Sequence, residues 1–498
     1  MKQKTWRKHH KWLGIILAFF MLMFCISGII LNHRRLVSDF SISRSWLPDD
    51  YTFKNWNGGL MRGTLRYNAD DSLTSVITYG NSGIWIADTA GTSFKDFNAG
   101  LPINADERNI KGCTITNDGT LWTVSQFGLF RYDNKSSKWD TVNLPFYEDE
   151  KLSDITVHGD TLIVVGRSDL FISLAPYTEF KNIRIKAPAD FDGNVSLFKT
   201  IWDAHNGSLL GIGGRLFIDG VAIIFIIICI TGIVYWLMPK YIHRLKKRGR
   251  DVKKATSLLK SNLNWHDKTG RYTFGILLFV AVTGWCLRPP LLIAIANIDV
   301  PSIPFTSVST DNAWHDKLRM MRYDEKENEW LLSSSEGFYS LKSLTDIPQP
   351  VTVVPPVSVM GINAWEKDAE GNWIVGSFSG MFTWNRSTGV VKDFFTGEVT
   401  HETSGSPFGK FAVSGYTDDF KCGTAVVEYI SGTDKIHMPE ELSSLPMSLW
   451  NVAHEIHSGR IYTFLGNINI LYITIIGIFI IWCLISGYKI RMKKKKKR

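Results

Sequence analysis

The sequence has few cysteines and lacks the common motifs of hydrolytic, nucleotide-binding and thiol-redox sites. Only six of its 498 residues are cysteine, and no two are arranged as Cys-x-x-Cys, which argues against a thioredoxin-like or iron–sulfur site. No Gly-rich phosphate loop follows an expected strand, and neither His-Glu-x-x-His nor Gly-x-Ser-x-Gly occurs. If the protein handles electrons, it must therefore obtain them from another molecule.

Polar residues are scarce in four stretches of about 20 residues, each long enough to cross a hydrocarbon core of ~30 Å. These stretches are 12–32, 216–238, 272–296 and 466–488. The first is not expected to be a cleaved signal peptide, because Asn32-His33-Arg34-Arg35 follows it where a small-residue cleavage site would stand. The sequence therefore predicts a membrane protein with a four-helix transmembrane bundle.

Positive charge is concentrated beside these stretches. Residues 1–11 carry five Lys or Arg, 240–260 carry nine with one Asp, and 489–498 carry eight. Together they hold a net +21 against +9 for the whole chain, so the remainder holds −12. The positive-inside rule then places both termini and the connector in the cytoplasm, against the lipid bilayer. The position of these runs beside membrane helices favours lipid headgroups over nucleic acid as their partner.

The resulting domain plan alternates membrane segments with loops. The predicted order is a cytoplasmic tail (1–11), a first span (12–32), an external β domain (33–215), a second span (216–238), a basic cytoplasmic connector (239–271), a third span (272–296), a second external β domain (297–465), a fourth span (466–488) and a basic tail (489–498).

Both external regions are expected to be all-β, because short alternating apolar runs are bounded by Gly, Asp and Asn. The expected strands are 84–88, 119–124, 128–133 and 161–165 in the first region, and 328–332, 337–341, 371–375 and 380–385 in the second. The repeated spacing of Trp, aliphatic pairs and Gly-aromatic pairs resembles propeller blades. Two interpretations remain: one propeller shared by both regions, or two separate sandwich-like domains. Cys113 and Cys422, one in each region, could form a disulfide bridge if the compartment is oxidising.

The membrane segments repeat. His10 is followed four residues later by Gly, and then by an apolar run that ends at Ser27-Gly28. At an offset of 256 residues, His266 is followed in the same way by a run that ends at Thr283-Gly284. Each unit also contains a second segment with a His-x-Gly head and a small-Gly end. These heads are His205 and His457, and the ends are Thr231-Gly232 and Ser486-Gly487.

Histidines at membrane edges are candidates for function, and the repeat pairs them. His10 with His266, and His205 with His457, would place two imidazoles near each membrane surface. Neutral imidazole is a ligand that suits haem iron, and four-helix bundles bind cofactors between facing helices. The alternative is that each His is only an interfacial residue. His33 could replace one external ligand, or lie beside Arg34 and Arg35, which could pair with haem propionates.

This ordered pattern of His-Lys-Trp-Leu-Gly, Ser-Gly, His-x-Gly and Thr-Gly resembles the PepSY-associated transmembrane family of bacterial inner-membrane proteins. The resemblance implies an iron-regulated haem b protein that reduces ferric siderophores on the periplasmic side. It implies two haems, with His10 and His266 as iron ligands on the cytoplasmic side and His205 and His457 on the external side. The external regions depart from the family because no PepSY module is evident in them, which puts the substrate in doubt.

The expected function is therefore transmembrane electron transfer. Electrons would come from a cytoplasmic flavin reductase or a membrane quinol and would reduce a ferric siderophore or another ferric chelate in the periplasm. The enzyme class would be an oxidoreductase with no catalytic residues beyond the haem and its ligands. The alternative is a non-enzymatic membrane sensor whose propeller-like exterior binds a ligand or a partner protein.

Overall fold

The computed structural model describes residues 2–68, 74–145, 150–296, 298–358, 360–402, 404–406 and 409–492. The last six residues of the basic tail, 493–498, thus lie outside the described chain. The chain divides into two compact units. The helical unit contains residues 1–37, 193–310 and 449–498, and the β unit contains residues 38–192 and 311–448.

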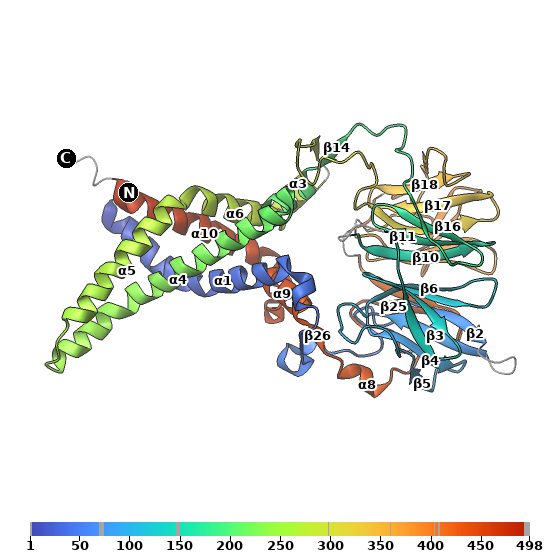
Figure 1. Ribbon diagram of the computed structural model, residues 1–498, viewed down its shortest axis with the longest axis horizontal. Helices are drawn as coiled ribbons and strands as arrows, with labels where there is room; N and C mark the ends of the chain where they lie inside the picture. Colours follow the sequence, from blue (N-terminus) through green and yellow to red (C-terminus); the bar gives the residue numbers. More distant parts are fainter. Residues whose placement is uncertain are drawn as a thin grey trace. The chain divides into compact units, whose positions relative to one another are not determined.

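Four apolar helices lie side by side in the helical unit (Figure 1). They are α1 (Gln3–Asn32), α4 (Gly211–Lys247), α6 (Phe274–Cys286) and α10 (Asn469–Met492). Within the described chain, three segments are long and apolar enough to cross a membrane: Gln3–Asn32, Ser208–Lys247 and Leu471–Ile490. The first two contain the first and second predicted spans, and the third covers residues 471–488 of the fourth.

The predicted third span, 272–296, is not one continuous helix. Its helix α6 has 13 residues, which gives about 20 Å at 1.5 Å per residue and is too short to cross alone. The helix ends at Cys286 because Pro289 and Pro290 follow, and a proline can neither donate the next helical hydrogen bond nor leave the preceding residue free to be helical. A separate short helix, α7 (Leu291–Ile295), takes up the rest of the apolar run.

The basic connector between the second and third predicted spans is helical. α4 continues to Lys247, beyond the apolar run, and five residues separate it from α5 (Lys253–Tyr272). Only Thr273 separates α5 from α6. The prediction of a short connector at 239–271 therefore missed about seven turns of helix, because its polar sequence gave no membrane signal.

Short elements complete the helical unit. They are α2 (Arg34–Val37), α3 (Leu197–Asn206), η3 (Ser208–Leu210), α9 (Leu449–His457), η4 (Thr463–Ile468) and the antiparallel pair of β14 (Asn194–Ser196) and β15 (Asp299–Pro301). α3 and α9 each end just before a glycine in the left-handed conformation, Gly207 with φ +85° and Gly459 with φ +75°. A Cβ at Gly207 would stand 2.2 Å from the carbonyl oxygen of Gly214, so only glycine permits this turn.

The β unit contains six consecutive antiparallel sheets, each paired in sequence order. Sheet 1 is β2 (Gly63–Asn68), β3 (Thr74–Gly80), β4 (Gly83–Asp88) and β5 (Phe94–Asp96). Sheet 2 is β6 (Ile110–Ile115), β7 (Leu121–Ser125), β8 (Leu129–Asp133) and β9 (Lys138–Val142). Sheet 3 is β10 (Leu152–His158), β11 (Thr161–Gly166), β12 (Leu170–Leu174) and β13 (Lys181–Ile183).

The second outer region supplies the other three sheets. Sheet 4 is β16 (Leu318–Asp324), β17 (Glu329–Ser334), β18 (Gly337–Leu341) and β19 (Gln349–Pro350). Sheet 5 is β20 (Ile362–Lys367), β21 (Trp373–Ser377), β22 (Gly380–Asn385) and β23 (Val390–Asp393). Sheet 6 is β24 (Val413–Thr417) and β25 (Ala425–Glu428). All eight strands expected from the sequence are confirmed.

Smaller elements lie at the ends of the β unit. They are β1 (Ser41–Ile42), which pairs with β26 (Met447–Ser448), and the short helices η1 (Arg44–Trp46), η2 (Asp49–Tyr51) and α8 (Glu440–Ser443).

An apolar cluster lies at each junction between neighbouring sheets, and the sixth sheet packs against the first. The clusters include Ile77 with Leu121, Trp122 with Ile155, Ile163 with Met321, Leu331 with Trp365, Ile374 with Val413, and Val427 with Val76. The two outer regions therefore pack together as one compact unit. The alternative of two separate sandwich-like domains is wrong.

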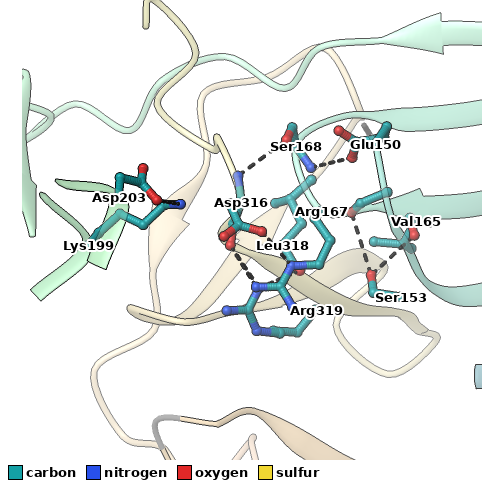
Figure 2. Close-up of polar contacts among 11 residues, drawn as sticks. Glu150, Ser153, Val165, Arg167, Ser168, Lys199, Asp203, Asp316, Leu318 and Arg319 are labelled. Carbon is teal, nitrogen blue, oxygen red and sulfur yellow. Dashed lines mark hydrogen bonds and ion pairs between the residues drawn. The ribbon is translucent and has the colours of Figure 1, made fainter. Parts of the chain in front are cut away.

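Polar contacts join the two outer regions as well. Arg322 on β16 donates to Asp154 on β10 at 2.6 Å, and that carboxylate is buried. Nearby, Arg167 forms an ion pair with Asp316 at 2.8 Å, and Arg319 donates to the Asp316 backbone carbonyl at 3.0 Å (Figure 2). Sheet 3 precedes the helical insertion and sheet 4 follows it. These contacts therefore join the two halves of the β unit.

The proposed bridge between Cys113 and Cys422 is not formed. Both are free thiols; Cys113 lies 3.1 Å from the Thr123 hydroxyl, whereas Cys422 is exposed. Sequence alone placed one cysteine in each region but could not bring them together.

We expect one pH effect from the centre of the β unit. Glu366 on β20 is accessible to solvent but densely surrounded by protein, and loss of hydration raises its pKa from 4.5 to about 7, partly opposed by Arg322. Between these two pH values the folded protein holds a proton that the unfolded chain has lost, so stability falls as pH rises through the window. Thermal unfolding of the full protein from pH 4.5 to 8 should show that fall.

Glu366→Gln is the variant that isolates this effect, because an amide does not titrate. Asp154 and Glu150 also have raised pKa values and act in the same direction, so the informative quantity is the difference between wild type and variant. That difference should change across pH 4.5–7 and be constant above it. A constant difference throughout would contradict the raised pKa of Glu366.

Candidate functional site

The structure brings His10 and His266 together. His10 lies in the first third of α1 and His266 lies in the second half of α5. Their ring centroids are 6.1 Å apart, with 55° between the ring planes. His10 Nδ1 is 3.1 Å from the carbonyl oxygen of Cys483, and His266 Nδ1 is 3.2 Å from that of Ile228.

His205 and His457 form a second pair with nearly the same geometry. Their ring centroids are 6.2 Å apart, with 53° between the planes. His457 Nδ1 is 3.0 Å from the carbonyl oxygen of Phe24, and His205 Nδ1 is 3.2 Å from the Thr283 hydroxyl. The sequence placed both histidines at the heads of the membrane helices, whereas each lies at or near the end of a separate short helix, α3 or α9.

Each imidazole contacts the hydroxyl of a small-Gly motif on another helix. The contacts are His10 with Ser486 at 3.4 Å, His266 with Thr231 at 3.0 Å, His205 with Thr283 at 3.2 Å, and His457 with Ser27 at 3.0 Å. Every one of these hydroxyls donates to a carbonyl of its own helix; Ser27, for example, donates to Met23 at 2.6 Å. The hydroxyl oxygen is then an acceptor, so the Nδ1 nitrogen is the one that carries the proton.

This hydrogen bonding leaves Nε2 of each imidazole with its lone pair. Among the described residues, these four side chains form their hydrogen bonds through Nδ1 alone. A protonated Nδ1 held by a carbonyl or hydroxyl oxygen is the arrangement that fixes ring orientation in metal-ligating histidines. Nε2 is therefore the atom through which each of the four imidazoles could ligate a metal.

The glycine of each motif gives the imidazole its space. A Cβ at Gly284 would stand 2.7 Å from His205 Cε1, and one at Gly487 would stand 2.8 Å from His10 Cε1. The corresponding distances are 3.3 Å for Gly28 against His457 and 3.4 Å for Gly232 against His266. The repeat makes these motifs visible in the sequence but does not indicate their role. Their fixed position in every copy was the available signal.

The donor set fits haem. With a metal–nitrogen bond of about 2 Å and a ring centre about 1 Å further, two imidazoles on one metal have centroids about 6 Å apart, as both pairs do. Within the described ranges, no group of three or more His, Cys, Asp or Glu is placed to hold a metal ion. Each pair therefore offers two ligands, the number that a porphyrin leaves open on its iron.

The other predicted residues lie apart from the two pairs. His33 Nε2 is 2.7 Å from the Asp219 carboxylate, which also accepts from Asn32 at 2.9 Å, so this imidazole is already engaged. The Arg34 guanidinium lies 4.0 Å from the centre of the Trp450 ring, and Arg35 is exposed on α2.

Solved structures with some similarity come from B. thetaiotaomicron. Two are extracellular domains described as BT4673, a candidate one component or hybrid two component system, with 10% identity and TM-scores of 0.34 and 0.35. A third is the extracellular domain of the candidate hybrid two component system BT3049, with 11% identity and a TM-score of 0.32. Each match covers 77% of this chain and only 39–40% of the other, so the chain spans less than half of those structures.

No curated protein matches the chain. By contrast, the family described as the PepSY-associated TM region matches residues 115–494, which is more than half of the sequence. Together with three helices long enough to cross a bilayer, this match makes the protein a multi-pass membrane protein that carries a β unit. The chain belongs to the PepSY-associated TM region family.

Proposed function

We propose that the protein is a di-haem transmembrane electron-transfer protein that reduces a ferric siderophore or a similar ferric chelate in the periplasm. The observation that carries the proposal is the pair of matched histidine sites. Each has two imidazoles about 6 Å apart, with Nδ1 held by a neighbouring helix. Haem b bound at such sites would supply one-electron chemistry.

The two sites lie at different depths in the membrane. α1 carries His10 near its start and contacts His457 through Ser27 near its end. Ser27 lies 17 positions after His10, which corresponds to a rise of about 26 Å along the helix. Basic residues cluster around His10 and His266, so this pair lies on the cytoplasmic side under the positive-inside rule. The His205–His457 pair then lies toward the periplasm.

The fourth membrane crossing in this proposal is composite. α6 is too short alone, but the last turn of α5 precedes it with only Thr273 between them, and α7 follows. The protein then has two repeated helix pairs in the bacterial inner membrane, with both termini cytoplasmic and the β unit periplasmic.

The β unit is the part that would meet the substrate. Its six sheets share a core at every junction, including that of the sixth with the first, as the blades of a six-bladed propeller do. We assign it the capture of the ferric chelate. The electron donor would be a cytoplasmic flavin reductase or a membrane quinol that meets the His10–His266 end.

An absorption spectrum tests the proposal. Protein purified in detergent from haem-supplied cells should show a sharp Soret band, split low-spin bands after dithionite reduction, and close to two haems per chain. The reduced protein should then be reoxidised by a ferric chelate with formation of Fe(II). A colourless protein would overturn the proposal and would leave the membrane sensor as the better explanation.

A further inference from the structure

Arg288 is a cation that the function proposed above does not yet use. It lies just after α6, one turn beyond Gly284, which faces His205. The Arg288 side chain is partly buried, and it lies close enough to His457 and Glu455 for its charge to act on both. Among the described residues, its side chain forms no hydrogen bond or ion pair.

The carboxylate of Glu455, whose charge acts on Arg288, already has an ion-pair partner. Glu455, on α9, accepts from Arg460 Nε at 2.9 Å and also forms a second contact with that guanidinium. Arg460 in turn contacts His454 Nδ1 at 3.0 Å, and His454 stacks on Trp450, which the Arg34 guanidinium covers from 4.0 Å. The Arg288, Arg460 and Arg34 guanidinium groups are thus gathered around His454, one turn before His457 on α9.

A partly buried guanidinium without an acidic partner is costly, because its lost hydration is not replaced. The cost is removed if an anion from outside the chain lies against it. Guanidinium groups bind carboxylates through paired N–H donors, and such charge-assisted bonds are among the strongest in proteins. The position beside two imidazoles proposed to ligate haem iron favours an anion that accompanies the metal group.

We propose that Arg288 binds a propionate carboxylate of the haem held by the His205–His457 pair. Arg288 is then a positioning residue for this haem and makes its reduction easier by offsetting the propionate's negative charge. The proposal rests on the di-haem function. An anionic ferric chelate would offer the same carboxylate chemistry, and the experiment separates the two sources.

The first test replaces Arg288 with leucine and with lysine. Arg288→Leu should release one of the two haems about tenfold faster, as expected for loss of a charge-assisted hydrogen bond, and should lower the midpoint potential of that haem alone. Arg288→Lys should restore most of the potential but not the full retention, because lysine keeps the charge without the paired donors. Arg271→Leu is the matched control, because Arg271 has its own carboxylate, Asp267, at 2.9 Å.

The second test changes the haem instead of the protein. Wild-type apoprotein reconstituted with haem dimethyl ester should release the ester as fast as the Arg288→Leu variant releases normal haem. The ester should cause no further loss in the Arg288→Leu variant, since both changes remove the same contact. Equal binding of haem and its ester by wild type would overturn the assignment, although the di-haem function would still stand.

The chelate alternative has its own outcome. If Arg288→Leu keeps both haems and both potentials but reduces ferric citrate more slowly, the carboxylate belongs to the substrate, and the haem assignment is overturned. Absence of haem from the wild-type protein would overturn the proposed function itself, and this assignment with it.

Discussion

Replacement of His457 with alanine is expected to lower the haem content from about two per chain to about one. His457 and His205 face each other with centroids 6.2 Å apart, so loss of either removes one of two iron ligands. A haem left with one imidazole keeps only one of its two axial bonds. It should be lost on purification or become high-spin. Pyridine haemochrome analysis gives the count, and the reduced spectrum gives the spin state.

His454→Ala is the matched control for this variant. His454 lies one turn earlier on the same helix α9, but it stacks on Trp450 and is 3.0 Å from Arg460 instead of facing another histidine. This variant should keep both haems. His10→Ala should again leave one haem. The haem that remains should be the one at the His205–His457 pair, which His457→Ala loses. Equal haem content in all three variants and wild type would rule out ligation by these pairs.

Pairing of the four histidines was predictable because the chain repeats. A repeated unit packs against its copy in an equivalent way, so equivalent residues such as His10 and His266 approach each other. The position of each histidine within its helix was less predictable. The sequence showed His205 two residues before a glycine, but not that Gly207 would adopt φ +85° and separate α3 from the membrane helix.

Sequence patterns could not predict the contacts between distant segments. Strand positions followed from alternation and turn residues, and all eight expected strands are present. That Ile163 and Met321 belong to one core depends on packing across more than 150 residues of chain, which local patterns do not encode. The break in the third predicted span was missed for a different reason: hydropathy averages over the Pro289-Pro290 pair, whereas a continuous helix cannot run through it.

The glycines of the small-Gly motifs provide the second large expected effect. Gly284→Ala should remove most of one haem, because its Cβ would stand 2.7 Å from His205 Cε1, closer than carbon atoms approach without movement. The imidazole would have to rotate away from the Thr283 hydroxyl, which orients it at 3.2 Å. Haem content measured as above should fall toward one per chain, and the remaining haem should keep its wild-type spectrum.

Gly275→Ala distinguishes this steric effect from a general effect of alanine in the helix. Gly275 lies on the same helix α6, but a Cβ there would meet no atom within 4 Å, and alanine is the better helix former by about 1 kcal/mol. This variant should keep two haems. The four motifs also predict an order: Gly487→Ala, at 2.8 Å, should impair the His10–His266 site strongly, whereas Gly28→Ala and Gly232→Ala, at 3.3 and 3.4 Å, require a shift of only a few tenths of an ångström. Haem loss that followed helix stability instead of this order would show that the imidazoles are not held as the structure places them.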